Sequence, residues 1–486
     1  MGKYLIAHDL GTSGDKASLF STEGTLVKSY TASYETQYFH KNCAEQNTED
    51  WWQAVCTATR EITKDIEPEA VLGISFSSQM QACIAVDRNG NALRPVMIWA
   101  DQRARKQVNE LVSKVGETRM YEINGHRPSA SYSIEKLMWI KEHEPDIYQN
   151  TYKMLLAKDY IICRLTGAFV TDYSEASGTD AFDLKELKWS EEILKAAGIE
   201  EGKMPELHAS TDVIGSLTEK AAEELGLTTS TKDGQMFLSY GTSAWIAGTS
   251  DEVFLDKDRT LICFGHVIPG KYMPCGTMQA AGSSYSYIRH ALCKEEEAVA
   301  EKEGVSVYEV MNRLVEASPA GAKGMIFLPY LVGERSPRWN PDTSGSFLGI
   351  RMEHEKCDYI RAVLEGVAMN LGIILEKQRE RGKISELILT GGGAKGDVLS
   401  QTLADVLGVK IHRLDHVETA TSVAAAVIAG IGVGVFDDFS VVDQFVKKEK
   451  TFTPHEEYKE IYDRQKKLFE KGYKCLVDYY KVDAQI

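Results

Sequence analysis

Short apolar runs alternate with polar turns along the first eighty residues, a pattern that predicts a mixed α/β protein. The runs YLIAH (4–8) and ASLFST (17–22) flank the turn that contains Gly-Thr-Ser-Gly, and such short runs between turn residues are typical of strands. We expect them to pair as a hairpin around residues 11–14. Residues 49–66 have helical spacing with Thr48 as the expected N-cap, and VLGISFSS (71–78) predicts another strand.

The same kind of pattern begins again in the second half of the chain. MFLSY (236–240) is an apolar run that ends in a second Gly-Thr-Ser, and CDYIRAVLEGVAMNLGIILEKQRE (357–380) predicts a long amphipathic helix. The polar segment TTSTKDG (228–234) separates the two halves. We therefore divide the chain into an N-terminal domain, 1–234, and a C-terminal domain, 235–486.

Size and composition narrow the class of protein. A chain of 486 residues is too long for one ordinary core. The net charge of −16 argues against a nucleic-acid binder or an anionic-membrane binder, since either needs a basic face.

The cysteines and the apolar stretches indicate the compartment. Nine cysteines without a CxxC pair predict reduced thiols. The beginning MGKYLIAHDL is not a secretory signal, and the most apolar stretch, 423–436, is too short to span a bilayer and predicts a buried helix followed by a glycine turn. We expect a cytoplasmic protein.

The first turn carries residues that suit a phosphate site. Gly11 lets backbone N–H groups approach an anion, and the hydroxyls of Thr12 and Ser13 add donors. Asp9, at the end of the preceding strand, could hold Mg²⁺ directly or through water. An ordinary hairpin with glycine at positive φ is the alternative for this motif alone.

Two further glycine turns strengthen the phosphate interpretation. Gly241-Thr242-Ser243 repeats the first turn, and two such hairpins would clamp the phosphates of one nucleotide from both sides. The segment LTGGGAKGD (389–397) follows an expected strand and precedes an expected helix. Its residues Gly391, Gly392, Gly393 and Ala394 leave room for a nucleoside, although a tight strand–helix connection would need the same glycines.

In this order, the motifs D-L-G-T-S-G-x-K, W-A-D-Q-R, Y-G-T-S and G-G-G-A resemble the FGGY carbohydrate kinases. SYSIEKLMWIKEH (131–143) and GSFLGIRMEHEKCDYIRAVLE (345–365) resemble the two signatures of that family. The resemblance implies two actin-like (ribonuclease H-like) ATPase lobes with an interlobe cleft. It also implies ATP and Mg²⁺ as cofactors, Lys16 beside the phosphates, and transfer of the γ-phosphoryl group to a sugar hydroxyl.

Within that family, residues 327–350 and 171–184 look most like xylulokinases, which makes D-xylulose the expected acceptor. The resemblance places Trp99, Asp101 and Arg103 in the sugar site, together with Gln79, Met80 and Gln81. Gln81 stands where those kinases have histidine, so gluconate, ribulose or another polyol stays open. The alternative for Trp99 is core packing, and for Arg103 a surface charge. The expected partner is a small sugar, with neither nucleic acid nor membrane, and the chain is compatible with a homodimer.

One expected segment is missing from the sequence. FGGY kinases have a Gly-Gly-x-Asp segment, whose aspartate is the catalytic base, before the second Gly-Thr-Ser strand. Here residues 224–243 pass almost directly into that strand, so roughly twenty residues are absent. Asp233 is the nearest carboxylate in sequence, but it precedes the strand whereas the turn follows it, which makes it a weak candidate for the base. A sugar- or nucleotide-binding protein with little kinase activity is therefore the alternative function.

Overall fold

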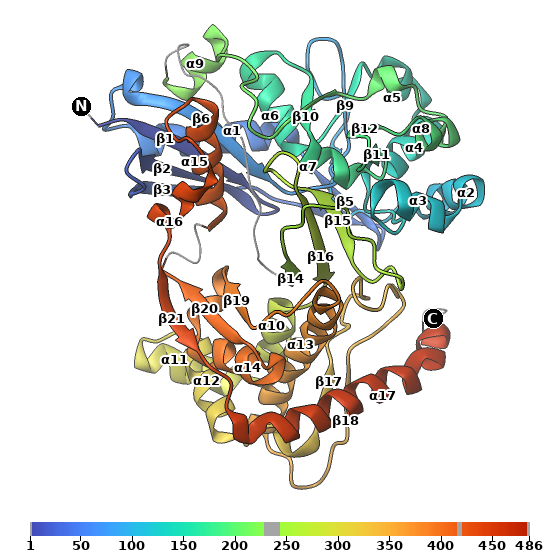
Figure 1. Ribbon diagram of the computed structural model, residues 1–486, viewed down its shortest axis with the longest axis vertical. Coiled ribbons are helices and arrows are strands. Elements are labelled where there is room, and N and C mark those ends of the chain that lie inside the picture. The colour runs from blue at the N-terminus through green and yellow to red at the C-terminus, as the bar shows by residue number, and fades with distance from the viewer. Residues whose placement is uncertain (1, 228–243, 416–419, 484–486) are drawn as a thin grey trace.

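The computed structural model describes residues 2–227, 244–415 and 420–483. They form two lobes, one above the other in Figure 1. The first half of the chain builds most of the upper lobe and the second half builds the lower one. A cleft between the lobes is lined by residues from both halves. The predicted α/β architecture with two lobes and an interlobe cleft is confirmed.

The central sheet of the upper lobe has the strand order β3-β2-β1-β6. Strand β1 runs antiparallel to β2 and parallel to β6, so the hairpin predicted around residues 11–14 is present. The adjoining helix begins one residue away from the expected cap, because the Asn47 side chain, and not Thr48, accepts from the amide of Glu49. The bounds are β1 Tyr4–Leu10, β2 Gly14–Ser21, β3 Leu26–Ser33, α1 Thr48–Thr63 and β6 Val71–Ser78.

The rest of the upper lobe consists of short helices and small sheets that pack beside the central sheet. Its helices are α2 Arg105–Val115, α3 Glu117–Asn124, α4 Ser133–His143, α5 Pro145–Asn150, α6 Ala157–Thr166, α7 Tyr173–Ala176, α8 Glu191–Ala197 and α9 Glu219–Leu225. Its small sheets contain β4 Gln37–Phe39, β5 Cys43–Gln46 and β8 Val96–Met97; β7 Ile84–Val86 and β9 Lys153–Leu155; β10 Val170–Asp172 and β13 Glu206–His208; and β11 Phe182–Asp183 and β12 Lys188–Trp189.

The lower lobe is built around the long helix α13, which buries most of one face against the strands beside it. Its strands are β14 Ala244–Ala247, β15 Ile262–Gly265 and β16 Tyr272–Met278; β17 Ile326–Leu328 and β18 Ser346–Leu348; and β19 Glu386–Leu389, β20 Lys410–Leu414 and β21 Lys448–Phe452. Its helices are α10 Gly282–Leu292, α11 Lys294–Glu303, α12 Val307–Ala317, α13 Lys356–Arg379, α14 Asp397–Leu407 and α17 Lys459–Asp483. The last of these runs along the outer edge of the lobe (Figure 1).

One segment of the second half returns to the upper lobe. Helix α15 (Ala420–Gly432) lies beside β1 and β6 in Figure 1, and α16 (Val442–Phe445) lies below it near β3. Val423 and Val427 of α15 belong to one apolar cluster with Ala7 and Phe20 of the sheet. The expected buried helix is therefore present, and the division of the chain in sequence does not coincide with the division in space. The proposed boundary, 234/235, lies outside the described residues.

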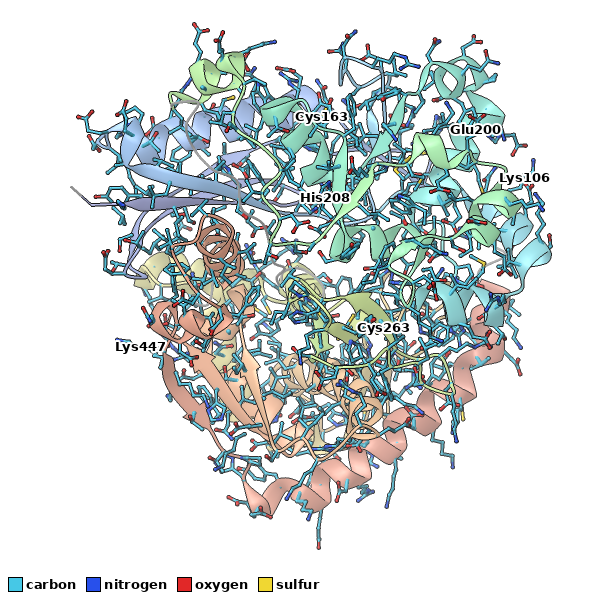
Figure 2. All side chains as sticks on the ribbon, turned by 45° about the horizontal axis from the view of Figure 1, so that its top comes forward. Lys106, Cys163, Glu200, His208, Cys263 and Lys447 are labelled. Atoms are coloured by element: carbon cyan, nitrogen blue, oxygen red, sulfur yellow. The ribbon has the colours of Figure 1, made fainter. Side chains whose placement is uncertain are left out.

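The two lobes also meet at the middle of the molecule. Cys263 of β15 lies there in Figure 2, and its amide donates to the carbonyl of Gly125 in the upper lobe at 3.0 Å. All nine cysteines are unpaired, as predicted. No helix within the described ranges has the length and apolar character needed to cross a membrane.

Candidate active site

Backbone hydrogen bonds, both within the turn and from the neighbouring strand, hold the turn between β1 and β2. The Gly11 amide donates to the Gly14 carbonyl at 2.9 Å, and the Tyr34 amide donates to the Ser13 carbonyl at 3.1 Å. A Cβ on Gly14 would lie 2.7 Å from the carbonyl oxygen of Ala32, so only glycine fits there. The hydroxyl of Ser13 is exposed. The turn can therefore present hydroxyls and amides to an anion while the sheet holds its shape.

Thr12 is the most strongly held residue of this turn. The indole Nε1 of Trp99 donates to its Oγ1 at 3.0 Å, although the two residues are 87 positions apart. The side-chain amide of Gln46 donates to its carbonyl oxygen at 2.7 Å. The turn predicted to bind phosphate and the tryptophan predicted to bind sugar are thus in direct contact.

Asp9 lies at the end of β1, half-buried, opposite Ser77 of β6 and Lys16 of β2. The Ser77 hydroxyl donates to Asp9 Oδ1 at 3.3 Å. No group of three or more potential metal ligands occurs within the described ranges. Mg²⁺ beside a nucleotide needs few protein ligands, because phosphate oxygens and waters supply the others. An oxygen-donor set of one carboxylate beside the phosphate turn fits that role.

The third glycine turn has the structure that its sequence predicts. It follows β19 and passes through a short 3₁₀ segment, Gly392–Lys395, into α14. Gly391 has φ of 93°, which L side chains rarely adopt, and its carbonyl accepts from the amide of Ala394 at 2.9 Å. Contact with a nucleoside stays a prediction. The other predicted nucleotide residues, Gly241, Thr242 and Ser243, lie outside the described residues, as does Asp233.

Gln79, Met80 and Gln81 follow β6 and are not among the residues that line the cleft, so their contact with a sugar stays a prediction. The Gln79 amide group donates to Gln46 Oε1 at 2.7 Å, which ties it to the phosphate turn. Gln81 has φ of 65°, and its carbonyl accepts from the buried ammonium of Lys136 at 2.8 Å. The signature helix α4 thereby holds the backbone of Gln81 in a left-handed conformation that non-glycine residues rarely adopt.

Asp101 and Arg103 form a buried ion pair. Asp101 has no exposed surface, and its Oδ2 accepts from the Ala44 amide at 2.8 Å and from Arg103 at 2.7 Å. The guanidinium of Arg103 lies over the rings of Phe39 and Trp139. Neither Asp101 nor Arg103 lines the cleft, whereas Trp99 does. Arg103 also pairs with Glu45 at 2.8 Å. Contact of Asp101 and Arg103 with a sugar stays a prediction.

The cleft has a volume of about 800 Å³, enough for a small sugar and its surroundings. Its second-half wall, which was not predicted from the sequence, includes Gln279, Ser283, Glu334, Arg335 and Trp339. Arg335 Nη2 donates to Ser131 Oγ at 2.7 Å, and its contact with Gln81 Oε1 is 3.5 Å. Burial raises the pKa of Glu334 to about 8. Glu334, Arg335 and Trp339 belong to the segment FLPYLVGERSPRW (327–339). That segment indicated the family but did not by itself indicate that these side chains line a cleft.

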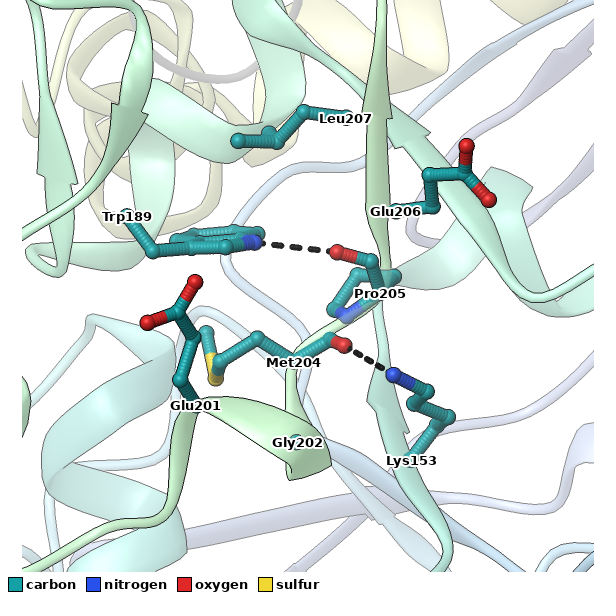
Figure 3. A pocket seen from close by; sticks show the side chains of 8 residues that line it. All are labelled: Lys153, Trp189, Glu201, Gly202, Met204, Pro205, Glu206 and Leu207. Carbon is teal, nitrogen blue, oxygen red and sulfur yellow. Dashed lines mark hydrogen bonds between the residues drawn. The ribbon is translucent and has the colours of Figure 1, made fainter.

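Two smaller hollows are less suitable. One, of about 420 Å³, is lined by Trp189 and its neighbours on the upper lobe (Figure 3). The indole N–H of Trp189 donates to the Pro205 carbonyl at 2.9 Å, and Lys153 donates to the Met204 carbonyl at 2.6 Å, so these polar groups already have partners within the protein. The other, of about 330 Å³, is lined in part by Arg381, which donates to the Thr249 carbonyl at 2.8 Å. Neither hollow contains a predicted site residue, so the interlobe cleft is the candidate active site.

Comparison with known proteins agrees with this geometry. The xylulose kinase of Lactococcus lactis is 32% identical over 96% of this chain and 96% of its own length. A gluconate kinase structure from Lactobacillus acidophilus superposes with a TM-score of 0.91 at 26% identity, covering 99% of each chain. A ligand-bound xylulose kinase structure from the same organism gives 0.90 at 27%, again covering 99% of each chain. Family models match residues 4–232 and 236–433 as the N- and C-terminal domains, and the chain belongs to the FGGY family of carbohydrate kinases.

Proposed function

We propose that this carbohydrate kinase transfers the γ-phosphoryl group of ATP to a hydroxyl of D-xylulose or of a closely similar ketopentose. The contact between Trp99 Nε1 and Thr12 Oγ1 carries the proposal, because it joins a sugar-sized cleft to a turn suited to phosphate. Similarity to xylulose kinases favours the ketopentose. Gluconate is the second candidate acceptor, since a gluconate kinase structure superposes equally well.

Catalysis in such a site depends on placing the reactants, since phosphoryl transfer needs little covalent chemistry from the protein. Backbone amides of residues 11–14 and the hydroxyls of Thr12 and Ser13 would hold the phosphates from the upper lobe. The proposed second turn, Gly241–Ser243, would hold them from the other side. Asp9 would hold Mg²⁺ through water, and that ion neutralises charge on the phosphates when bound.

The cleft wall would hold the sugar. The indole of Trp99 would offer a flat face to the sugar ring, and Ser131 and Arg335 would offer polar groups beside it. Gln81 lies behind them, 3.5 Å from the Arg335 guanidinium. Because Arg335 and Ser131 come from different halves of the chain, their hydrogen bond keeps the two walls together. A closed cleft excludes water, which would otherwise accept the phosphoryl group.

No catalytic base is identified among the described residues of this chain. The alignment with the Lactococcus relative spans 496 positions, more than the 486 residues of this chain, so the relative has residues that this chain lacks. The segment inferred to be missing before the second Gly-Thr-Ser strand would account for part of that difference, and its absence stays a prediction from the sequence. General-base help typically contributes 10²–10⁴-fold. A chain without its base would therefore bind both substrates and turn over slowly.

The test is an ADP-release assay on protein of verified mass with D-xylulose, L-ribulose, gluconate and glycerol. We expect the highest kcat/KM with D-xylulose. Preference for gluconate would replace the proposed acceptor and leave the kinase assignment intact. Tight sugar binding by calorimetry without ADP release from any acceptor would establish the alternative, a sugar-binding protein of the kinase fold.

A further inference from the structure

The Thr12 hydroxyl is the junction between the sugar-side wall and the phosphate turn. An indole N–H only donates, so Thr12 Oγ1 is the acceptor of the 3.0 Å bond from Trp99. A hydroxyl that accepts one bond still has its hydrogen to give. Among the described residues, none accepts that hydrogen. The Thr12 O–H is thus available to a phosphate oxygen, and Trp99 restricts the directions in which it can point.

The backbone of Thr12 is fixed as tightly as its side chain. Gln46 is buried, and all its hydrogen-bonding groups are engaged. Its Nε2 donates to the Thr12 carbonyl and to Thr36 Oγ1, each at 2.7 Å, and its Oε1 accepts from Trp51 at 3.1 Å and from Gln79 at 2.7 Å. The peptide that carries the Thr12 hydroxyl is therefore connected through Gln46 to Gln79, and through its side chain to Trp99 in the cleft wall.

We propose that Trp99 is a positioning residue for phosphoryl transfer, acting through Thr12, with Gln46 holding the peptide of Thr12 in place. A sugar packed on the indole restrains the ring, the ring's N–H orients the Thr12 hydroxyl, and the hydroxyl donates to the phosphate. Sugar binding and nucleotide binding then strengthen each other. This inference rests on the proposed kinase function and assigns Trp99 a role beyond that of a sugar-stacking surface.

The decisive variant is Trp99→Phe, which removes the N–H and keeps an aromatic face. Loss of one neutral hydrogen bond corresponds to about a 3- to 10-fold effect. We expect kcat to fall by that factor while the KM for the sugar changes less than about twofold. Trp189→Phe is the matched control, since Trp189 loses an equivalent indole bond to the Pro205 carbonyl outside the cleft. An unchanged kcat, or a raised KM with kcat preserved, would overturn the proposal.

Two further measurements keep the proposal testable if a variant is unstable or if catalysis is slow. The first is a double-mutant cycle with Thr12, and the second measures binding and needs no turnover. If Trp99 acts through Thr12, Trp99→Phe should have no further effect on kcat in a Thr12→Val background, and additive losses would contradict the proposal.

The coupling between the two ligands can be measured by calorimetry. Sugar should raise the affinity for a non-hydrolysable ATP analogue in the unchanged protein, and Trp99→Phe should remove that increase. Binding of both ligands without mutual effect would refute the coupling alone. Binding of neither would refute the kinase function as well.

Discussion

Arg335 and Ser131 are joined across the cleft by a hydrogen bond of 2.7 Å, although they are separated by 204 positions in the chain. Arg335 is half-buried, and its guanidinium also lies 3.5 Å from Gln81 Oε1. Replacing it by methionine removes a charged donor and keeps much of the apolar stem. A hydrogen bond to a charged group is worth about 1.5–3 kcal/mol. We expect Arg335→Met to raise the KM for the sugar roughly 10- to 100-fold in steady-state assays.

Arg351 provides the control for that experiment. Its side chain is 63% exposed and faces only Glu353, at 3.8 Å, in the same lobe. Arg351→Met should leave both KM values unchanged because exposed pairs of this kind contribute little. If the two arginine variants behave alike, Arg335 does not hold the cleft together.

Asp101 should affect the sugar site indirectly. Asp101→Asn removes the charge that pairs with Arg103 at 2.7 Å and keeps an oxygen for the Ala44 amide. The guanidinium keeps Glu45 at 2.8 Å but loses its charged hydrogen bonds to Asp101, a loss of about 1.5–3 kcal/mol. We expect a lower unfolding free energy by urea titration and weaker sugar binding by calorimetry, with nucleotide affinity nearly intact. Unchanged sugar affinity would show that the Asp101–Arg103 pair does not shape the cleft.

Local pattern was sufficient to predict the elements that position the site. The hairpin at residues 11–14, the strand 71–78 and the buried helix after residue 420 all follow from apolar spacing and turn residues. The error at the start of α1 is one residue, because Asn47 and Thr48 can both cap a helix and only geometry selects Asn47. The return of α15 to the first lobe has no local signal, since its apolar face would suit either core.

The site was predicted in parts and not as an assembly. The turn residues and Trp99 were identified, but their contact joins segments 87 positions apart, and spacing alone does not predict such pairs. For Asp101 and Arg103, the motif named the residues, and the structure adds partners from other segments, the Ala44 amide for Asp101 and Glu45 for Arg103, which spacing does not predict. Arg335 was missed because an arginine in a loop has many possible uses, and only folding brings it to Ser131.

The buried carboxyl pair Glu135 and Asp180 should make stability depend on pH. Burial raises the pKa of Glu135 to about 8, and burial beside Glu135 raises the pKa of Asp180 well above its usual range. Between the ordinary carboxyl pKa and pH 8, the folded state therefore binds more protons than the unfolded state. The free energy of unfolding must fall as pH rises through that window. We expect a loss of roughly 2–4 kcal/mol between pH 5.5 and pH 8, measured by urea titration.

Asp180→Asn tests the origin of that dependence. Asparagine tolerates the φ of 67° at this position. Its side-chain N–H can donate to Glu135, whereas an aspartate must first bind a proton to do so. The variant should be more stable than the unchanged protein at pH 8, with a flatter pH profile. Asp65→Asn, at a carboxylate whose side chain is 79% exposed, should leave the profile as it is. The slope due to Glu135 remains in the variant, because burial is what raises the pKa of that carboxyl. A profile identical to that of the unchanged protein would show that Asp180 does not titrate in this window.

Asp9 should matter only when metal is present. Asp9→Asn keeps an oxygen for the Ser77 hydroxyl, which donates at 3.3 Å in the unchanged protein, and removes the negative charge. Mg²⁺ held between that carboxylate and the phosphates would lose a charged protein contact. We expect the affinity for ATP in the presence of Mg²⁺ to fall roughly 10- to 100-fold, the effect of one charge-assisted contact. With EDTA in place of Mg²⁺, the variant and the unchanged protein should bind ATP equally, and sugar affinity should not change in either condition. Calorimetry on both proteins under both conditions measures all of these quantities. An equal loss with and without metal would mean that Asp9 shapes the turn and does not hold the ion.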